Sequence, residues 1–194
     1  MIKSIKIIVK GLVQGVGFRP FVYRIAQKYN LKGNVENRND GVLIHIEGEP
    51  DLVNQFLVSL KNEAPIASSI ESIAVQDNVV LYFQNFEIVK SNNMSDTITE
   101  ISPDIAVCDD CLTDLKNQNH RIDYPFINCT NCGPRFTIIR DIPYDRDKTT
   151  MKDFVMCDIC KEEYTDVNDR RFHAQPVACN NCGPTYELFY NGNI

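Results

Sequence analysis

Four Cys-x-x-Cys pairs in the second half of the chain are the strongest chemical signal in the sequence. Two thiolates so spaced can bind one metal ion together, and two such pairs complete the four sulfur ligands of a structural Zn²⁺. The sequence therefore predicts two structural zinc ions, with no coordination position left open for a substrate. The predicted ligands are Cys108, Cys111, Cys129, Cys132, Cys157, Cys160, Cys179 and Cys182.

Disulfides and dithiol redox chemistry are the alternatives for these cysteines. Disulfides need an oxidising compartment, and the only apolar run near the start, Ile7-Ile8-Val9, is too short for a signal peptide or a membrane span. Four repeated pairs are more than a dithiol reaction needs. We therefore expect zinc binding in the cytoplasm and no membrane association.

The grouping of the pairs is not fixed by their spacing. The intervals between successive pairs are 17, 24 and 18 residues, and both sequential and nested grouping use all eight thiolates. The first pair recurs after 49 residues and the second, with its Cys-Gly-Pro sequence, after 50. This internal repeat indicates a duplicated module and favours sequential grouping. His120 and His173 are then surplus as ligands.

A glycine-rich segment, Gly11-Leu-Val-Gln-Gly-Val-Gly-Phe-Arg19, is the second chemical signal. Glycines let a backbone turn sharply and point successive N–H groups at an anion, and the arginine adds charge-assisted donors suited to phosphate. A glycine turn followed by a surface arginine is the plainer explanation. From spacing alone the two readings are about equally supported.

The elements around this segment predict its place in a fold. Strand-like alternation precedes it at residues 5–9, and a helix follows from Pro20 to Tyr29. Further strands are expected at 31–39, 42–48, 70–75 and 86–89, with a second helix at 52–60. The order β-α-β-β-α-β-β predicts an α+β, ferredoxin-like unit with one added strand. His45 is out of phase with the apolar residues of its strand, so we expect it to be exposed.

A chain of 194 residues is long for a single domain, which favours two units. We expect a first domain at 1–90, a linker at 91–97, the duplicated cysteine module at 98–185 and the start of a missing downstream domain at 186–194. Residues 1–90 carry a net charge of +1 and the remainder −7. The acidic second half argues against nucleic-acid binding by the cysteine module.

The first 90 residues resemble acylphosphatases. The glycine-rich segment matches the first part of that family's signature, and Gly33-x-Val-x-Asn37-x-x-Asp40-Gly41 resembles the second. The resemblance implies that Gln14, Gly15, Val16, Gly17, Phe18 and Arg19 bind the phosphoryl group. It also implies that Arg19 and Asn37 are the catalytic residues, with Asn37 positioning the attacking water.

The cysteine module is similar to the zinc-finger region of the HypF family. The similarity rests on Tyr124-Pro-Phe-Ile-Asn-Cys-Thr-Asn-Cys-Gly-Pro-Arg-Phe-Thr137, Ile142-Pro-Tyr-Asp-Arg146 and Asp169-Arg-Arg-Phe-His-Ala-Gln-Pro-Val-Ala-Cys179. Members of this family use carbamoyl phosphate and ATP to carbamoylate HypE, which supplies the cyanide ligand of [NiFe]-hydrogenase. The resemblance implies that this chain hydrolyses carbamoyl phosphate to carbamate and phosphate, whereas the ATP-dependent steps belong to downstream domains that are missing here.

Two other functions stay open from the sequence. The chain could be a stand-alone acylphosphatase with a structural zinc appendage, or a non-catalytic zinc adaptor that docks HypE or the missing domains. A substrate panel separates the first of these from carbamoyl phosphate hydrolysis, and partner binding with and without a chelator tests the second.

Overall fold

The computed structural model describes residues 2–91, 100–187 and 189. The predicted linker at 91–97 lies, apart from Ser91, outside the described residues. Of the segment 186–194, only residues 186, 187 and 189 are described.

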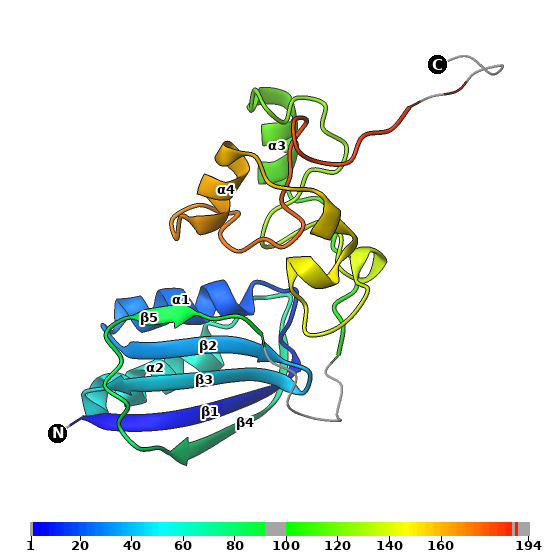
Figure 1. Cartoon of the computed structure of the whole chain (residues 1–194). Coiled ribbons are helices and arrows are strands. Elements are labelled where there is room, and N and C mark those ends of the chain that lie inside the picture. Colours follow the sequence, from blue (N-terminus) through cyan, green and yellow to red (C-terminus); the bar gives the residue numbers. More distant parts are fainter. Residues whose placement is uncertain (1, 92–99, 188, 190–194) are drawn as a thin grey trace.

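The first unit is a five-stranded sheet covered on one face by two helices (Figure 1). The strand order is β4-β1-β3-β2-β5, and every neighbouring pair is antiparallel except β2 with β5. This arrangement confirms the predicted α+β, ferredoxin-like class and its element order. The elements are β1 (Lys3–Leu12), α1 (Phe18–Lys28), β2 (Lys32–Arg38), β3 (Gly41–Gly48), α2 (Pro50–Asn62), β4 (Ser69–Asp77) and β5 (Phe86–Ile88).

The hairpin between β2 and β3 brings the second signature segment beside the end of β1. Asn37 pairs with Val42, which itself pairs with Val9 of β1. Gly41 opens β3 at a φ of 140°, and a Cβ there would lie 2.2 Å from the Val9 carbonyl oxygen. Only glycine fits this approach. The hairpin therefore holds Asn37 next to the glycine-rich loop that leaves β1.

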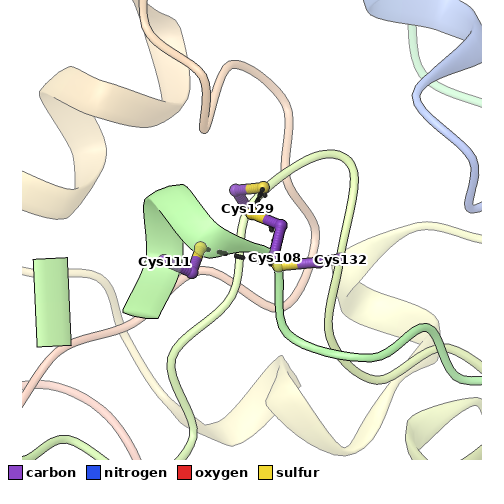
Figure 2. A group of neighbouring side chains, drawn as sticks. All are labelled: Cys108, Cys111, Cys129 and Cys132. Carbon is purple, nitrogen blue, oxygen red and sulfur yellow. Dashed lines mark hydrogen bonds between the residues drawn. The ribbon is translucent and has the colours of Figure 1, made fainter. Parts of the chain in front are cut away.

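The described part of the second unit contains two short α-helices and three 3₁₀ turns. The helices α3 (Asp109–Asn117) and α4 (Asp158–Thr165) each begin directly after the first cysteine of a Cys-x-x-Cys pair. The 3₁₀ turns η1 (Phe136–Ile138), η2 (Arg146–Lys148) and η3 (Thr150–Asp153) lie between the two halves of the repeat. Figure 2 shows the first four cysteine side chains converging, with Cys111 on α3. No helix in the described part of the chain is both long and apolar enough to cross a bilayer.

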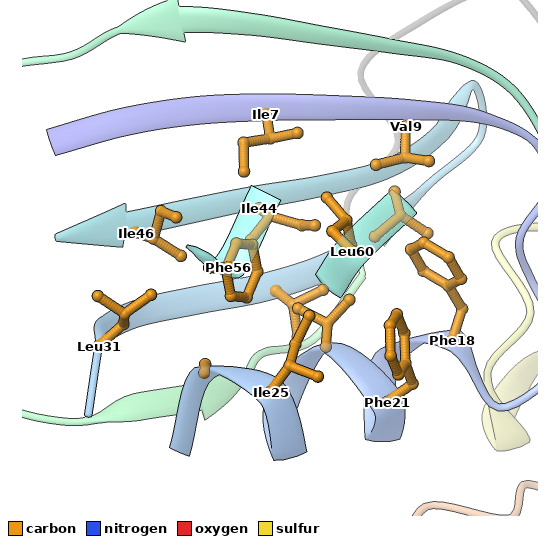
Figure 3. Packing of buried hydrophobic residues seen from close by; sticks show 14 of the residues in the cluster. Ile7, Val9, Phe18, Phe21, Ile25, Leu31, Ile44, Ile46, Phe56 and Leu60 are labelled. Carbon is orange, nitrogen blue, oxygen red and sulfur yellow. The ribbon is translucent and has the colours of Figure 1, made fainter. Parts of the chain in front are cut away.

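The two units are stabilised in different ways. The first has a continuous apolar core in which α1 and α2 pack on the sheet, with residues such as Ile7, Ile44 and Phe56 fully buried (Figure 3). Burial of each such side chain contributes about 1.5–3 kcal/mol. Among its described residues the second has only two small clusters, and cysteines make up much of both. A core of that size needs metal or ion-pair support to hold a fold.

Two equivalent ion pairs join the halves of the repeat. Arg121, whose side chain is fully buried, binds Glu163 of α4, while Arg171 binds Asp114 of α3 at 2.5 Å. Arg171 follows Arg121 by 50 residues and Glu163 follows Asp114 by 49, as the cysteine pairs do. Each half therefore gives its arginine to the helix of the other half, as in a two-fold interface.

His45 was expected to be exposed, and this was only partly right. It lies on the sheet face opposite Ile44 and Ile46, but it is half-buried beside Phe83, with ring centroids 6.5 Å apart. Burial, the first cause, lowers the pKa of His45, and the charge of Lys6 adds to the effect.

Candidate active site and metal centres

The glycine-rich loop between β1 and α1 forms a nest of free backbone donors. Gly15 and Gly17 have φ values of 72° and 76°, and Gly17 is the N-cap of α1. None of the amide N–H groups from Gln14 to Arg19 donates a hydrogen bond to any described residue. Free amides at a helix N-terminus form an anion-binding site with the helix dipole behind them.

Three side chains of this loop have structural roles. Gln14 donates to the carbonyls of Arg38, at 2.5 Å, and Gly41, at 3.0 Å, which ties the loop to the β2–β3 hairpin. Val16 and Phe18 are buried in the main core. The contribution of these three residues to anion binding is therefore limited to their backbone.

Arg19 lies at the start of α1 with its side chain only 8% exposed. Its Nη1 is 2.6 Å from a carboxylate oxygen of Asp145, and its Nη2 donates to the Tyr144 carbonyl at 3.1 Å. Both partners belong to the second unit. Nη1 also donates to Ser91 Oγ at 3.4 Å. A guanidinium has five N–H donors, so these three contacts leave donors for a phosphoryl group.

Asn37 is buried, with 1% of its surface exposed, and its amide is only half satisfied. Nδ2 donates to the Tyr144 carbonyl at 3.1 Å, whereas Oδ1 has no hydrogen-bond partner among the described residues. Because a carbonyl only accepts, this contact fixes the amide so that the oxygen is the free end. A buried free acceptor is suited to orienting a water molecule through one of its protons.

The second unit closes over this site. Arg135 is 2% exposed and donates to the Gly15 carbonyl and to carbonyls of the second cysteine pair, including that of Thr130 at 2.9 Å. A Cβ on Gly17 would lie 2.9 Å from the Thr130 methyl group. Figure 1 shows the second unit over the α1 and β5 side of the first, with the turns at 146–153 near the start of α1.

A small cavity of about 30 Å³ lies between the units. The first unit contributes the loop, Arg19 and Asn37, and the second contributes Tyr144 and His173 among others. Burial raises the pKa of the Tyr144 phenol to about 12, so it stays protonated. Burial and then the charge of Arg19 lower the pKa of His173 to about 4, so its imidazole is neutral near pH 7.

The cysteines form two groups, each made of successive pairs. Within each group the four Sγ atoms lie within 4.8 Å of one another, and all eight cysteines are free thiols. The sequence favoured this sequential grouping over the nested one. Neither His120 nor His173 belongs to a group. The members are Cys108, Cys111, Cys129 and Cys132 in the first, and Cys157, Cys160, Cys179 and Cys182 in the second.

The sulfur positions fit a tetrahedral zinc ion. A Zn–S bond of about 2.3 Å implies sulfur atoms about 3.8 Å apart in a tetrahedron. The first group has Sγ–Sγ distances of 3.8, 3.6 and 3.5 Å, and the second has 3.7 and 3.8 Å. Both donor sets therefore match Zn²⁺ in number, type and spacing.

Arginine side chains compensate the negative charge of these sulfur groups. Arg170 donates to Cys111 Sγ at 3.1 Å, and Arg121 donates to Cys160 Sγ at 3.3 Å. A zinc ion with four thiolates carries a net charge of −2, so such donors stabilise the occupied site. The contact between Cys111 and Cys132 lowers the pKa of Cys132, and hydrogen bonding with Cys129 and then Cys132 raises the pKa of Cys111.

Four residues of the candidate active site could not be identified from the sequence as partners of the glycine-rich loop. They are Arg135, Tyr144, Asp145 and His173, all from the second unit. Each lies in a segment that carried the family resemblance, and that resemblance was the only available signal. It marked the segments without indicating that they face Arg19 and Asn37.

Comparisons with known proteins match the two halves of the chain to different family models. The acylphosphatase family matches residues 5–88, and the HypF finger matches residues 107–139 and again 156–189. An acylphosphatase of Thermotoga petrophila is 38% identical over 87 residues, which cover 44% of this chain and 96% of that protein.

Longer relatives match both units together. The carbamoyltransferase HypF of Rhodobacter capsulatus is 43% identical over 191 residues, 96% of this chain and 25% of that protein. A crystal structure of full-length HypF in a phosphate- and nucleotide-bound form is 50% identical with a TM-score of 0.91, covering 99% of this chain and 26% of that one. The chain thus spans about a quarter of the length of these HypF relatives.

Proposed function

The chain belongs to the HypF family, of which it carries the acylphosphatase domain and the fingers, and on that basis we propose that it hydrolyses carbamoyl phosphate to carbamate and phosphate. The observation that carries the proposal is the free Asn37 Oδ1, which lines the same cavity as Arg19 and the unpaired loop amides. Together these groups supply anion binding and an acceptor for water.

In the proposed reaction a water oxygen forms a bond to phosphorus while the bond between phosphorus and the acyl oxygen breaks. Carbamate leaves with the electron pair of that bond, and the protons of the water pass to the phosphate product and to solvent. An acyl phosphate has a good leaving group, so positioning and charge neutralisation are sufficient and no nucleophilic side chain is needed.

Each group has one role in this scheme. The amides of the loop and the guanidinium of Arg19 bind the phosphoryl oxygens, whose negative charge persists through the transition state. Asn37 Oδ1 accepts a hydrogen bond from the attacking water. The Tyr144 carbonyl, by accepting from Asn37 Nδ2, keeps that oxygen turned toward the cavity.

We assign the two cysteine groups to structural Zn²⁺. The eight thiols and their spacing support this assignment, and apparent binding free energies of about 10–16 kcal/mol would compensate for the small apolar clusters of the second unit. Free thiols and zinc suit a reducing compartment such as the cytoplasm. Zinc here has no part in the chemistry, since four thiolates leave no open position.

Phosphate release from carbamoyl phosphate by Arg19→Ala tests the hydrolase assignment. We expect kcat/KM to fall by about 10²- to 10³-fold, because the transition state loses its main charged donor. The matched control is Arg24→Ala, which removes an exposed arginine further along the same helix and should retain full activity. An Arg19→Ala protein with unchanged zinc content and full activity would refute the site assignment.

The wider role is inherited from the family. We propose that carbamate formed here is used for ATP-dependent carbamoylation of HypE, a reaction that requires the other three quarters of the HypF length. A stand-alone acylphosphatase is the second candidate, and comparison of acyl phosphates distinguishes it.

A further inference from the structure

The cavity has two ends that come from different units. The loop, Arg19 and Asn37 define the phosphoryl end, whereas the finger segment from His173 to Pro176 lines the remaining wall together with Tyr144. A substrate whose phosphoryl group occupies the first end therefore presents its acyl group to finger residues. The chemistry of these finger residues therefore decides which acyl group the cavity accepts.

Most polar groups of the finger wall are already engaged. Gln175 Oε1 accepts from the Arg146 amide at 2.8 Å, and its Nε2 donates to the His173 carbonyl at 2.6 Å. The Tyr144 carbonyl accepts from both Arg19 and Asn37. The Tyr144 hydroxyl and the His173 imidazole are the exceptions, because neither has a hydrogen-bond partner among the described residues.

Packing fixes the His173 ring. Its centroid lies 4.7 Å from that of Phe172 in an edge-to-face contact and 4.8 Å from that of Tyr164. Its backbone φ of 54° is in the left-handed region, as is that of Asp123 (56°) 50 residues earlier, so this turn is a feature of the repeat. The ring is thus held by its aromatic neighbours in a residue that lines the cavity, and among the described residues its nitrogens have no hydrogen-bond partner.

The ionisation of His173 determines what it can offer. Burial and the neighbouring Arg19 hold its pKa at about 4, and the charge of Asp145 only partly opposes them. A neutral imidazole presents one N–H donor and one lone-pair acceptor. An acyl group that carries an N–H would satisfy the acceptor, whereas an alkyl acyl group would leave it unpaired.

We infer that His173 accepts a hydrogen bond from the amino group of carbamoyl phosphate, so that the finger module selects the acyl group hydrolysed by the acylphosphatase domain. This inference rests on the proposed function and adds a specificity-determining residue from the other unit. The small size of the cavity also favours the small carbamoyl group, because a bulky acyl group would collide with the finger wall.

Carbamoyl phosphate and acetyl phosphate form a matched pair for the test, since they differ by an amino group in place of a methyl group. The measurement is kcat/KM for phosphate release by the whole zinc-loaded chain. We expect the unchanged protein to prefer carbamoyl phosphate by about 3- to 10-fold, the effect of one neutral hydrogen bond.

Two substitutions remove the acceptor in different ways. His173→Phe keeps a ring between Phe172 and Tyr164, and His173→Gly suits the positive φ, so at least one should retain its two zinc ions. In either variant we expect the preference to fall to about one while acetyl phosphate is still hydrolysed. His45→Phe is the control, because that histidine lies outside the cavity, and its preference should be unchanged.

The outcomes separate the two proposals. Equal rates for both substrates in the unchanged protein, or an unaltered preference in a zinc-loaded His173 variant, would overturn the role of His173 and leave the hydrolase assignment standing. Hydrolysis of neither substrate by the unchanged protein would overturn both.

Discussion

From the ion pair between Arg19 and Asp145 we predict how much the charge of Asp145 lowers the affinity for phosphate. The two side chains are 8% and 15% exposed, and their closest atoms are 2.6 Å apart. A phosphoryl group bound to Arg19 must share the guanidinium with this carboxylate. Two unit charges 4 Å apart interact by about 4 kcal/mol at an effective dielectric constant of 20, and the guanidinium keeps the two anions further apart than that.

We therefore expect the carboxylate to weaken anion binding by about 2 kcal/mol, or about 30-fold. Asp145→Asn removes the charge while its amide oxygen can still accept from Arg19 Nη1, so the guanidinium stays oriented. The inhibition constant of inorganic phosphate against carbamoyl phosphate hydrolysis should fall by about that factor.

Asp147→Asn is the matched control for this measurement. Asp147 is two residues away, its side chain is 50% exposed, and its partner is Lys90 rather than Arg19. Because solvent screens the charge of Asp147, Asp147→Asn should leave the phosphate inhibition constant unchanged. If Asp145→Asn instead weakened phosphate binding, Asp145 would act chiefly by orienting Arg19, and the electrostatic reasoning would be wrong.

Three further predictions concern water positioning, the finger interface and zinc. Asn37→Ala should lower kcat by about 10²- to 10³-fold with phosphate inhibition within about threefold of normal, since its Nδ2 binds the Tyr144 carbonyl; a kcat within threefold would contradict this role. Arg121→Ala leaves Glu163 without its main donor and should lower the free energy of unfolding in urea by about 3–5 kcal/mol, and a loss below 1 kcal/mol would count against the ion pair. Burial opposes the ionisation of Glu163, but Arg121 outweighs it and lowers the pKa of the carboxyl group. The ion pair therefore stabilises the folded chain above the usual glutamate pKa, and the loss caused by Arg121→Ala should shrink as pH falls below about 4.5. Removal of zinc by a chelator should expose all eight thiols to a thiol reagent and abolish hydrolysis, because Tyr144 and Asp145 leave the site; full activity in a zinc-free chain would refute that coupling.

Local sequence patterns predicted most of the first unit because its elements follow simple periodicities. The strand at 42–48 and the helix at 52–60 differ from β3 and α2 only by one or two residues at their ends. The turn of the glycine-rich loop could also be predicted, since positive φ values and a following helix leave a clear sequence pattern.

The finger wall of the cavity could not be predicted in the same way. Arg19 and Asp145 are far apart in the sequence, and no pattern within either segment indicates that they meet. The role of the Tyr144 carbonyl is harder still to predict. Every residue has a backbone carbonyl, so the residue type does not indicate which carbonyl accepts these hydrogen bonds. Such contacts depend on how the two units pack, which periodicity does not encode.

The ion pairs between the finger halves were partly predictable from the sequence. The repeat that grouped the cysteines also places Glu163 at the position of Asp114 and Arg171 at that of Arg121. An acidic and a basic residue that recur at equivalent positions of a duplicated module can form a reciprocal interface, in which each half gives its arginine to the carboxylate of the other. This signal was present in the sequence, and it needed only the alignment of the two halves to be noticed.

Sharing of one cavity by both units gives the fingers a role beyond their own stability. Arg19 and Asn37 both bind the Tyr144 carbonyl, so their orientation depends on the position of a finger segment. That segment is held by Arg146, which donates to the carbonyls of Gln175 and Val177 beside the fourth cysteine pair. The zinc ion that we propose for the second group would therefore stabilise the geometry of a site to which it contributes no ligand. We expect hydrolysis to depend on zinc through structure alone, so another tetrahedral metal that preserves the finger fold should support it at a similar rate.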